Sequence, residues 1–272
     1  PFPALPSLCL EPNSPSWCLC AFVVFLALTA LVFCLRLCSL SWLSQKLLSV
    51  PPCLRGEVSW PFLLSPLCPP AMWISPLTLT GRTVRLEPIE KRHAPDLLAA
   101  ADRELFRFTP QAPAQWSVEG FERDIDRVNS LPNVVAFAII HLATGKAIGR
   151  TTYMEILPDH RGVEIGRTWI SRPFHGTLVN PEIKFLMLRH AFEQITPTAI
   201  RVQFTTGGQN VHSQAAIAKL GATREGTLRK CRIVPGGPDP TDPKIFRDTV
   251  YYSILDDEWP AVKRALLTRL GQ

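Results

Sequence analysis

One stretch of the sequence, residues 162–182, joins a strand, a short loop and a helix start in a way that suits a phosphate. It reads GVEIGRTWISRPFHGTLVNPE, and its loop contains Gly176. Asn180, Pro181 and Glu182 have the residue types that cap a helix, fill its first position and favour its positive end. Free backbone N–H groups at a helix start, together with the helix dipole, bind anions. The stretch predicts a phosphate site, although many helices begin in this way.

A carboxylate on the preceding strand could accept a proton. Glu164 lies in an alternating segment, so a regular strand places it on the same face as Gly166 and Thr168. Burial raises the pKa of a carboxylate, which suits a general base for a substrate ammonium group. The alternative is a salt bridge to an arginine such as Arg150 or Arg167, and the sequence favours neither.

Other chemistries lack their signatures. The sequence contains no GxGxxG, GxxxxGK[ST] or GxSxG motif, and its six histidines show no metal-ligand spacing. Cys231 is alone on an expected strand, where a packed thiol is the usual role. The histidine spacing gives no reason to expect a metal. Basic residues are scattered rather than gathered in a stripe, so we do not expect a nucleic-acid partner. Asn210 and Ser213 begin a further helix, as its N-cap and a first-turn capping partner.

Strands and helices alternate around these residues and predict a mixed α/β sheet without an internal repeat. The Thr144-Gly145 pair indicates a hairpin, and Ser117 is an expected N-cap. We expect strands at 83–89, 133–142, 147–156, 162–171, 199–206, 224–234 and 245–254, and helices at 93–102, 117–131, 180–195, 210–220 and 256–270.

The order E-I-G-x-x-W-I, H-G-T and N-x-E before an apolar helix resembles the GNAT superfamily of acetyl-CoA-dependent N-acetyltransferases. It is most similar to the RimJ/RimL-like branch, whose best-known members acetylate the N-termini of ribosomal proteins. Three further segments fit, each in the correct order: L-x-G-x-x-V-R-L-x-P at 79–88, N-x-x-S with K-L-G-A-x-x-E-G-T-L-R at 210–229, and R-D-T-V-Y-Y-S-I-L at 247–255. The resemblance covers about residues 77–270.

The resemblance implies a three-layer fold, in which helices flank a mixed, mostly antiparallel sheet. It implies acetyl-CoA as co-substrate and a primary amine, a protein N-terminus or a small molecule, as acceptor. Direct attack is expected, since no suitably paired Cys or Ser is present. The implied catalytic residues are Glu164 as base and Ser213 as donor to the leaving thiolate. The implied acetyl-CoA-binding residues are Trp169, Ile170, Ser171, His175, Gly176, Thr177, Val179, Asn180, Asn210 and Ser213, with backbone N–H groups of 168–171 facing the oxyanion and pantetheine.

The loop departs from the family pattern Q/R-x-x-G-x-G/A. Leu178 replaces the central glycine and Asn180 the last one. Glycine lets the backbone approach a pyrophosphate, so the leucine side chain would have to turn away. A catalytically silent acyl-CoA-binding or regulatory module is therefore the alternative.

Residues 1–71 differ in composition from the rest of the chain. They hold seven of the eight cysteines and five charged residues, and the first methionine is Met72. We expect a dispensable leader, non-native or disordered, with a cytoplasmic acetyltransferase domain, monomeric or homodimeric, at 72–272. The apolar run 17–35 is long enough to cross a bilayer, which leaves open a membrane anchor with its C-terminal side cytoplasmic. A buried core helix is the third reading.

Overall fold

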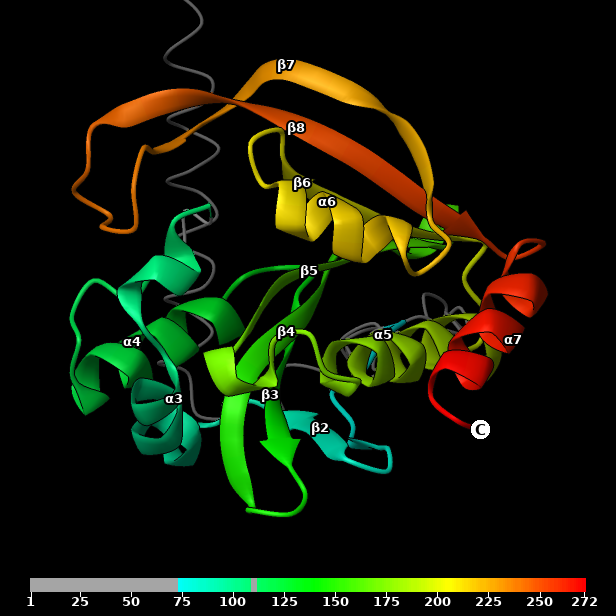
Figure 1. Cartoon of the computed structure of the whole chain (residues 1–272), viewed down its shortest axis with the longest axis horizontal. Helices are drawn as coiled ribbons and strands as arrows, with labels where there is room; N and C mark the ends of the chain where they lie inside the picture. Colours follow the sequence, from blue (N-terminus) through cyan, green and yellow to red (C-terminus); the bar gives the residue numbers. More distant parts are fainter. Residues whose placement is uncertain (1–72, 109–111) are drawn as a thin grey trace, which may run out of the picture. The chain divides into compact units, whose positions relative to one another are not determined.

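A single sheet organises the computed structural model, which describes residues 73–108 and 112–272 (Figure 1). Its order in these residues is β1-β2-β3-β4-β5-β6-β8-β7. All neighbouring strands are antiparallel except β5 and β6. The strands are β1 (Leu79–Thr80), β2 (Val84–Pro88), β3 (Val135–His141), β4 (Lys146–Leu157), β5 (Gly162–Ile170), β6 (Arg201–Gly207), β7 (Thr223–Pro235) and β8 (Lys244–Leu255).

Helices cover both faces of the sheet (Figure 1). They are α3 (Ala94–Ala100), α4 (Val118–Asn129), α5 (Val179–Arg189), α6 (Val211–Ala218) and α7 (Trp259–Arg269). On β3, Phe137 and Ile139 belong to the core cluster of α5, α6 and α7, whereas Ala136 and Ala138 belong to that of α3 and α4. This alternation separates the two cores, as the pleat of a strand requires.

The expected mixed, mostly antiparallel sheet with flanking helices is confirmed. Ser117 caps α4 by accepting a hydrogen bond from the backbone N–H of Gly120 at 3.1 Å. Gly145 forms the β3–β4 turn with a φ of 68°. The expectations for residues 1–71, including the apolar run 17–35, lie outside the described residues. None of the described helices has the length and apolarity that a membrane span needs.

The start of α5 differs from the expectation that Asn180 caps it. The helix begins at Val179, so Asn180 and Pro181 lie inside its first turn. The hydroxyl of Thr177 accepts a hydrogen bond from the N–H of Val179 at 3.3 Å. The Thr177 hydroxyl thus binds the first N–H of the helix, and the helix begins one residue before Asn180. The helix also ends earlier than expected, because residues 190–194 form a π-helical turn.

Glu182 connects α5 to the first part of the sheet. Its buried carboxylate accepts hydrogen bonds from the backbone N–H groups of Arg82 and Thr83 and from the Thr83 hydroxyl. Several donors at one carboxylate compensate for the water that it loses on burial. Glu182 therefore positions α5 against the segment that leads into β2.

Lys184 is the second buried charge-bearing side chain of α5. Its ammonium nitrogen is inside the core and donates to the Thr168 hydroxyl on β5 at 2.6 Å. Burial lowers the pKa of Lys184 from 10.5 to about 7, since no acidic group accompanies it.

This burial predicts a pH dependence of stability. Between pH 7 and 10.5 the unfolded chain binds a proton at Lys184 that the folded chain does not. The free energy of unfolding should therefore rise with pH in this window, by about 1 kcal/mol per pH unit. Lys184→Met should remove that slope and be the more stable protein at pH 7. Urea unfolding of both proteins at pH 7, 8 and 9 measures the difference. Parallel pH profiles would contradict the assignment.

Candidate active site

Strands β5 and β6 separate shortly after they pair. The parallel pairing joins only Gly162–Glu164 to residues 201–203. Beyond Glu164, β5 continues to Ile170 and β6 to Gly207 without pairing to each other. Each strand then presents an unpaired backbone edge, which can hydrogen-bond an extended ligand inserted between them. Helices α5 and α6 follow the ends of these two strands, so their N-termini belong to the same end of the sheet.

A β-bulge at Arg167 accompanies the separation. Arg167 has a φ of 51°, and two residues of β5, Arg167 and Thr168, lie opposite Thr151 alone on β4. A bulge bends its strand and increases its twist, which can turn β5 away from β6. The bulge also changes which residues share a face. Thr168 contacts Lys184 of α5, so the expectation that it shares a face with Glu164 is wrong.

Glu164 lies at the last residue pair before the strands separate. Its side chain is 2% exposed. One carboxylate oxygen accepts from the Thr205 hydroxyl at 2.6 Å, and the other accepts from the Gln203 amide at 2.9 Å. Both partners lie on β6, so Glu164 spans the two strands.

The alternative salt bridge of Glu164 does not form. Arg150 instead pairs with Asp124 of α4 at 2.5 Å. Arg167 has no ion pair or hydrogen bond within the described part of the chain. Glu164 is therefore a buried carboxylate held by neutral donors, with oxygen lone pairs left for a proton.

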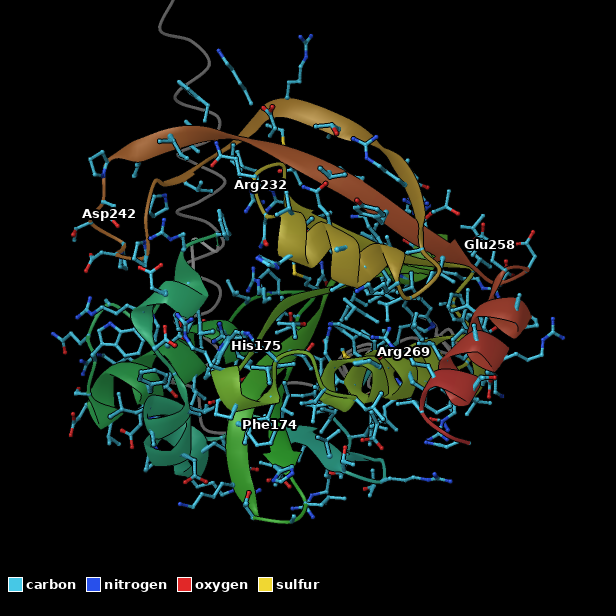
Figure 2. The ribbon with its side chains drawn as sticks, in the orientation of Figure 1. Phe174, His175, Arg232, Asp242, Glu258 and Arg269 are labelled. Atoms are coloured by element: carbon cyan, nitrogen blue, oxygen red, sulfur yellow. The ribbon has the colours of Figure 1, made fainter. Side chains whose placement is uncertain are left out.

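The loop between β5 and α5 is attached to the end of β5. The His175 ring nitrogen Nε2 donates to the carbonyl of Ile170 at 2.8 Å, and Figure 2 shows His175 in this loop beside Phe174. Gly176 has a φ of 75°, and no atom lies within 4 Å of where a Cβ would be. Leu178 is 47% exposed, so its side chain turns to solvent as the departure from glycine required.

Backbone N–H groups at the start of α5 are free to bind an anion. Those of Gly176, Thr177, Leu178 and Asn180 donate no hydrogen bond in the described structure, and Pro181 has no N–H. Four such donors at the positive end of an 11-residue helix fit the diphosphate of CoA.

The residues that precede the loop offer backbone rather than side chains. The Trp169 ring packs against Phe106 at 5.4 Å in the core under α3 and α4, and Ile170 lies in the opposite core. The N–H of Ser171 donates to the carbonyl of Ile148 on β4 at 2.8 Å. The expectation that this N–H faces the oxyanion is therefore wrong. Because successive N–H groups alternate between edges, that of Ile170 points away from β4.

Asn210 and Ser213 occupy the start of α6. The Asn210 side-chain oxygen accepts from the backbone N–H of Ser213 at 3.1 Å, which confirms the predicted N-cap. Ser213 is half-buried, and its hydroxyl has no hydrogen-bond partner among the described residues. The hydroxyl is available to a ligand that reaches this helix end. No group of three metal-ligating side chains occurs in residues 73–108 and 112–272.

Sequence reasoning missed the partners of Glu164 and the proximity of Arg247, although it named Arg167 as a neighbour. Gln203 and Thr205 become neighbours of Glu164 only through the β5–β6 register, which local patterns do not specify. Arg247 of β8 lies against Gly207 through the β6–β8 register. The alternation of β6 placed Gln203 and Thr205 on one face and was the one available signal.

Known proteins share this fold. The acetyltransferase (GNAT) domain profile matches residues 83–223. A Thermus protein, described as a candidate acetyltransferase from T. thermophilus, is 40% identical with a TM-score of 0.65; the match covers 73% of this chain and 100% of that one. A GCN5-related N-acetyltransferase from Brucella melitensis is 28% identical, with coverages of 72% and 86% and a TM-score of 0.65.

A ribosomal-protein-S5-alanine acetyltransferase from Vibrio fischeri is 17% identical, with coverages of 67% and 98% and a TM-score of 0.54, a likeness of fold alone. No curated protein matches the chain. The domain profile spans more than half of the chain, and the 40% identity extends over nearly three quarters of it. The chain therefore belongs to the GNAT acetyltransferase family.

Proposed function

We propose that the protein transfers an acetyl group from acetyl-CoA to a primary amine by direct attack, with Glu164 as the general base. The observation that carries the proposal is the position of this buried carboxylate at the point where β5 and β6 separate. GNAT acetyltransferases use acetyl-CoA, and the free N–H groups at the start of α5 suit its diphosphate.

Acetyl-CoA would supply the thioester that the amine attacks. We place its diphosphate at the N–H groups of Gly176, Thr177, Leu178 and Asn180, and its pantetheine along the unpaired edge of β5 that includes Ile170. His175 and Val179 support this loop from the strand end and the first helical turn. The binding uses backbone atoms, so it tolerates the side chains at 178 and 180.

The proton leaves the substrate ammonium group for Glu164. Because Glu164 is 2% exposed, we propose a bridging water between its carboxylate and the amine. Thr205 and Gln203 hold the carboxylate in place through the transfer. Ser213 is the proposed donor to the departing thiolate. A thiol has a pKa of about 8.5, so this leaving group needs little help.

The identity of the acceptor is a finer question. Membership of the RimJ/RimL-like branch, which would favour a protein N-terminus, stays a prediction, as does a cytoplasmic location. The silent acyl-CoA-binding alternative rested on Leu178. The Leu178 side chain is exposed and does not fill the loop, so the reason for the silent-module alternative is weaker.

Activity is tested with the purified full chain, acetyl-CoA and a panel of primary amines and N-terminal peptides, by following free thiol. We expect thiol release that depends on the amine and yields one acetyl amide per thiol. Binding of acetyl-CoA without thiol release on any acceptor would favour the silent module.

Removal of the Glu164 negative charge should slow turnover. Glu164→Gln should lower kcat by about 10²-fold or more, the usual share of a general base, and change the acetyl-CoA Kd by less than about twofold. Ser213→Ala should cost less. Asp159→Asn, an exposed carboxylate change in the connection between β4 and β5, is the matched control. An unchanged kcat for Glu164→Gln between pH 6 and 9 would place the base elsewhere.

The left-handed backbone of Gly176 should matter for acetyl-CoA. Gly176 and Gly145 both have positive φ, at 75° and 68°, and both face open space. Alanine at either position should destabilise the fold by about 1 kcal/mol, since L residues disfavour this conformation. We expect only Gly176→Ala to weaken acetyl-CoA binding. If the alanine shifts the loop backbone away from the binding conformation, a cost of about 1 kcal/mol corresponds to an increase of about fivefold in the acetyl-CoA Kd. Calorimetric titration of both variants checks this, and equal affinities would remove the loop from the binding site.

A further inference from the structure

Two arginines lie on either side of Glu164 without an acidic partner. Arg167 and Arg247 are each about half-buried. The buried Nε and Nη1 atoms of Arg167 and the buried Nε of Arg247 have no hydrogen-bond partner in the described residues. A guanidinium group keeps its charge in proteins, and burial without a partner is costly. These side chains have unused capacity for an anion.

The sheet brings the two arginines to one face. Glu164 contacts Gln203 and Thr205, which alternate with the core residues of β6. Arg247 lies over Gly207, the next residue of that alternation, with its Cδ 3.3 Å from the position of a Cβ there. Its Nη2 donates to the Thr249 hydroxyl at a long 3.4 Å. Arg247 therefore lies on the β6 side of Glu164.

Arg167 lies on the β5 side, in the bulge. Burial lowers the pKa of Arg167, nearby Arg150 and Arg127 lower it further, and Glu164 and Glu155 oppose them. Burial and Arg232 likewise lower the pKa of Arg247, while Glu164 raises it. Glu164 is thus within electrostatic reach of both arginines, one on β5 and the other on β8, the partner of β6.

Nearby acidic groups do not balance these charges. Asp124 accepts from both Arg150 and Arg127, so its carboxylate is already shared. Arg167 is a third cation beside Arg150 and Arg127, and Arg247 on β8 is a fourth. Glu155 is a further carboxylate within electrostatic reach of Arg167. The arginines Arg127, Arg150, Arg167 and Arg247 still outnumber the carboxylates Asp124, Glu155 and Glu164, which leaves an excess of positive charge around Glu164.

We propose that the acceptor amine carries a carboxylate or phosphate group, which Arg167 and Arg247 bind while the amine faces Glu164. This inference rests on the proposed acetyl transfer and narrows its acceptor. Guanidinium groups bind both anions through paired N–H donors. The same positive charge opposes polyamines and lysine-rich peptides.

Matched acceptors test the inference in the thiol-release assay with the full chain. The pairs are alanine and alaninamide, phosphoethanolamine and ethanolamine, and the peptide amides Ala-Asp-Ala and Ala-Asn-Ala. We expect at least one anionic member to exceed its neutral partner in kcat/KM by about tenfold or more, the usual strength of a charged hydrogen bond. The pairs separate small carboxylates, phosphates and acidic peptides. Equal or lower kcat/KM for every anionic member would overturn the proposal.

Variants assign the preference to the two arginines. Arg167→Gln and Arg247→Gln should each reduce the anionic preference about tenfold, mainly through the acceptor KM, and Arg167→Lys should keep part of it. Arg264→Gln removes an exposed charge from α7 and is the control. A retained preference in both glutamine variants, or a weakened acetyl-CoA Kd with unchanged acceptor KM, would overturn the assignment.

A binding measurement separates this inference from the proposed function. N-acetylalanine and N-acetylalaninamide are titrated into the full chain with CoA present, and no turnover is needed. We expect tighter binding of the carboxylate, lost in Arg167→Gln and Arg247→Gln. Equal binding of both probes would overturn the anion site even if acetyl transfer occurs. Selective carboxylate binding without thiol release on any amine would keep the site and reject the transfer.

Discussion

The separation of β5 and β6 is the constraint on which the site depends. Only three residue pairs join these strands, and they form the single parallel pairing of the described sheet. If the pairing continued, the β5 edge would be closed by hydrogen bonds and Glu164 would lie in the middle of a flat sheet. Because it stops there, both strands keep an unpaired backbone edge, and the starts of α5 and α6 follow the ends of these strands. The bulge at Arg167 provides a local physical cause, since bulges add twist.

The buried charges of the described structure follow two different rules. Glu182 and Arg150 each have a charged or polar partner within the protein: backbone donors hold Glu182, and Asp124 pairs with one terminal nitrogen of Arg150, although the Arg150 Nε has no partner in the described residues. Lys184 has only a hydroxyl partner, and its lowered pKa reflects that deficit. The buried Nε and Nη1 of Arg167 have no hydrogen-bond partner in the described residues. A buried group that the fold leaves unsatisfied is costly, so such groups concentrate where a ligand completes them. Glu182 and Arg150 therefore stabilise the scaffold, whereas Arg167 is the group that the proposed anionic acceptor would complete.

Much of the fold could be predicted from local sequence, because its signals are local. Alternation located the strands, and the N-caps at Ser117 and Asn210 are present. The start of α5 was misplaced because the helix begins at Val179 after Leu178, which has no capping side chain, so the residue types at 180–182 did not mark its first residue. The prediction that Thr168 shares a face with Glu164 was wrong because the bulge at Arg167 reverses the alternation of side chains along β5. Gln203, Thr205 and Arg247 were missed because their proximity depends on strand register across the sheet.

The loop before α5 explains how a sequence can depart from a glycine-rich pattern and keep an anion site. Glycine is favoured where the backbone is left-handed, and in this loop that is Gly176 alone. Leu178 has ordinary right-handed helical angles, so its side chain can turn to solvent without backbone strain. Its N–H remains free all the same, because a side chain that points outward does not cover the amide on the inner side. Position 178 therefore needs only a right-handed backbone, which many residue types adopt. Position 176 needs a left-handed backbone, which favours glycine.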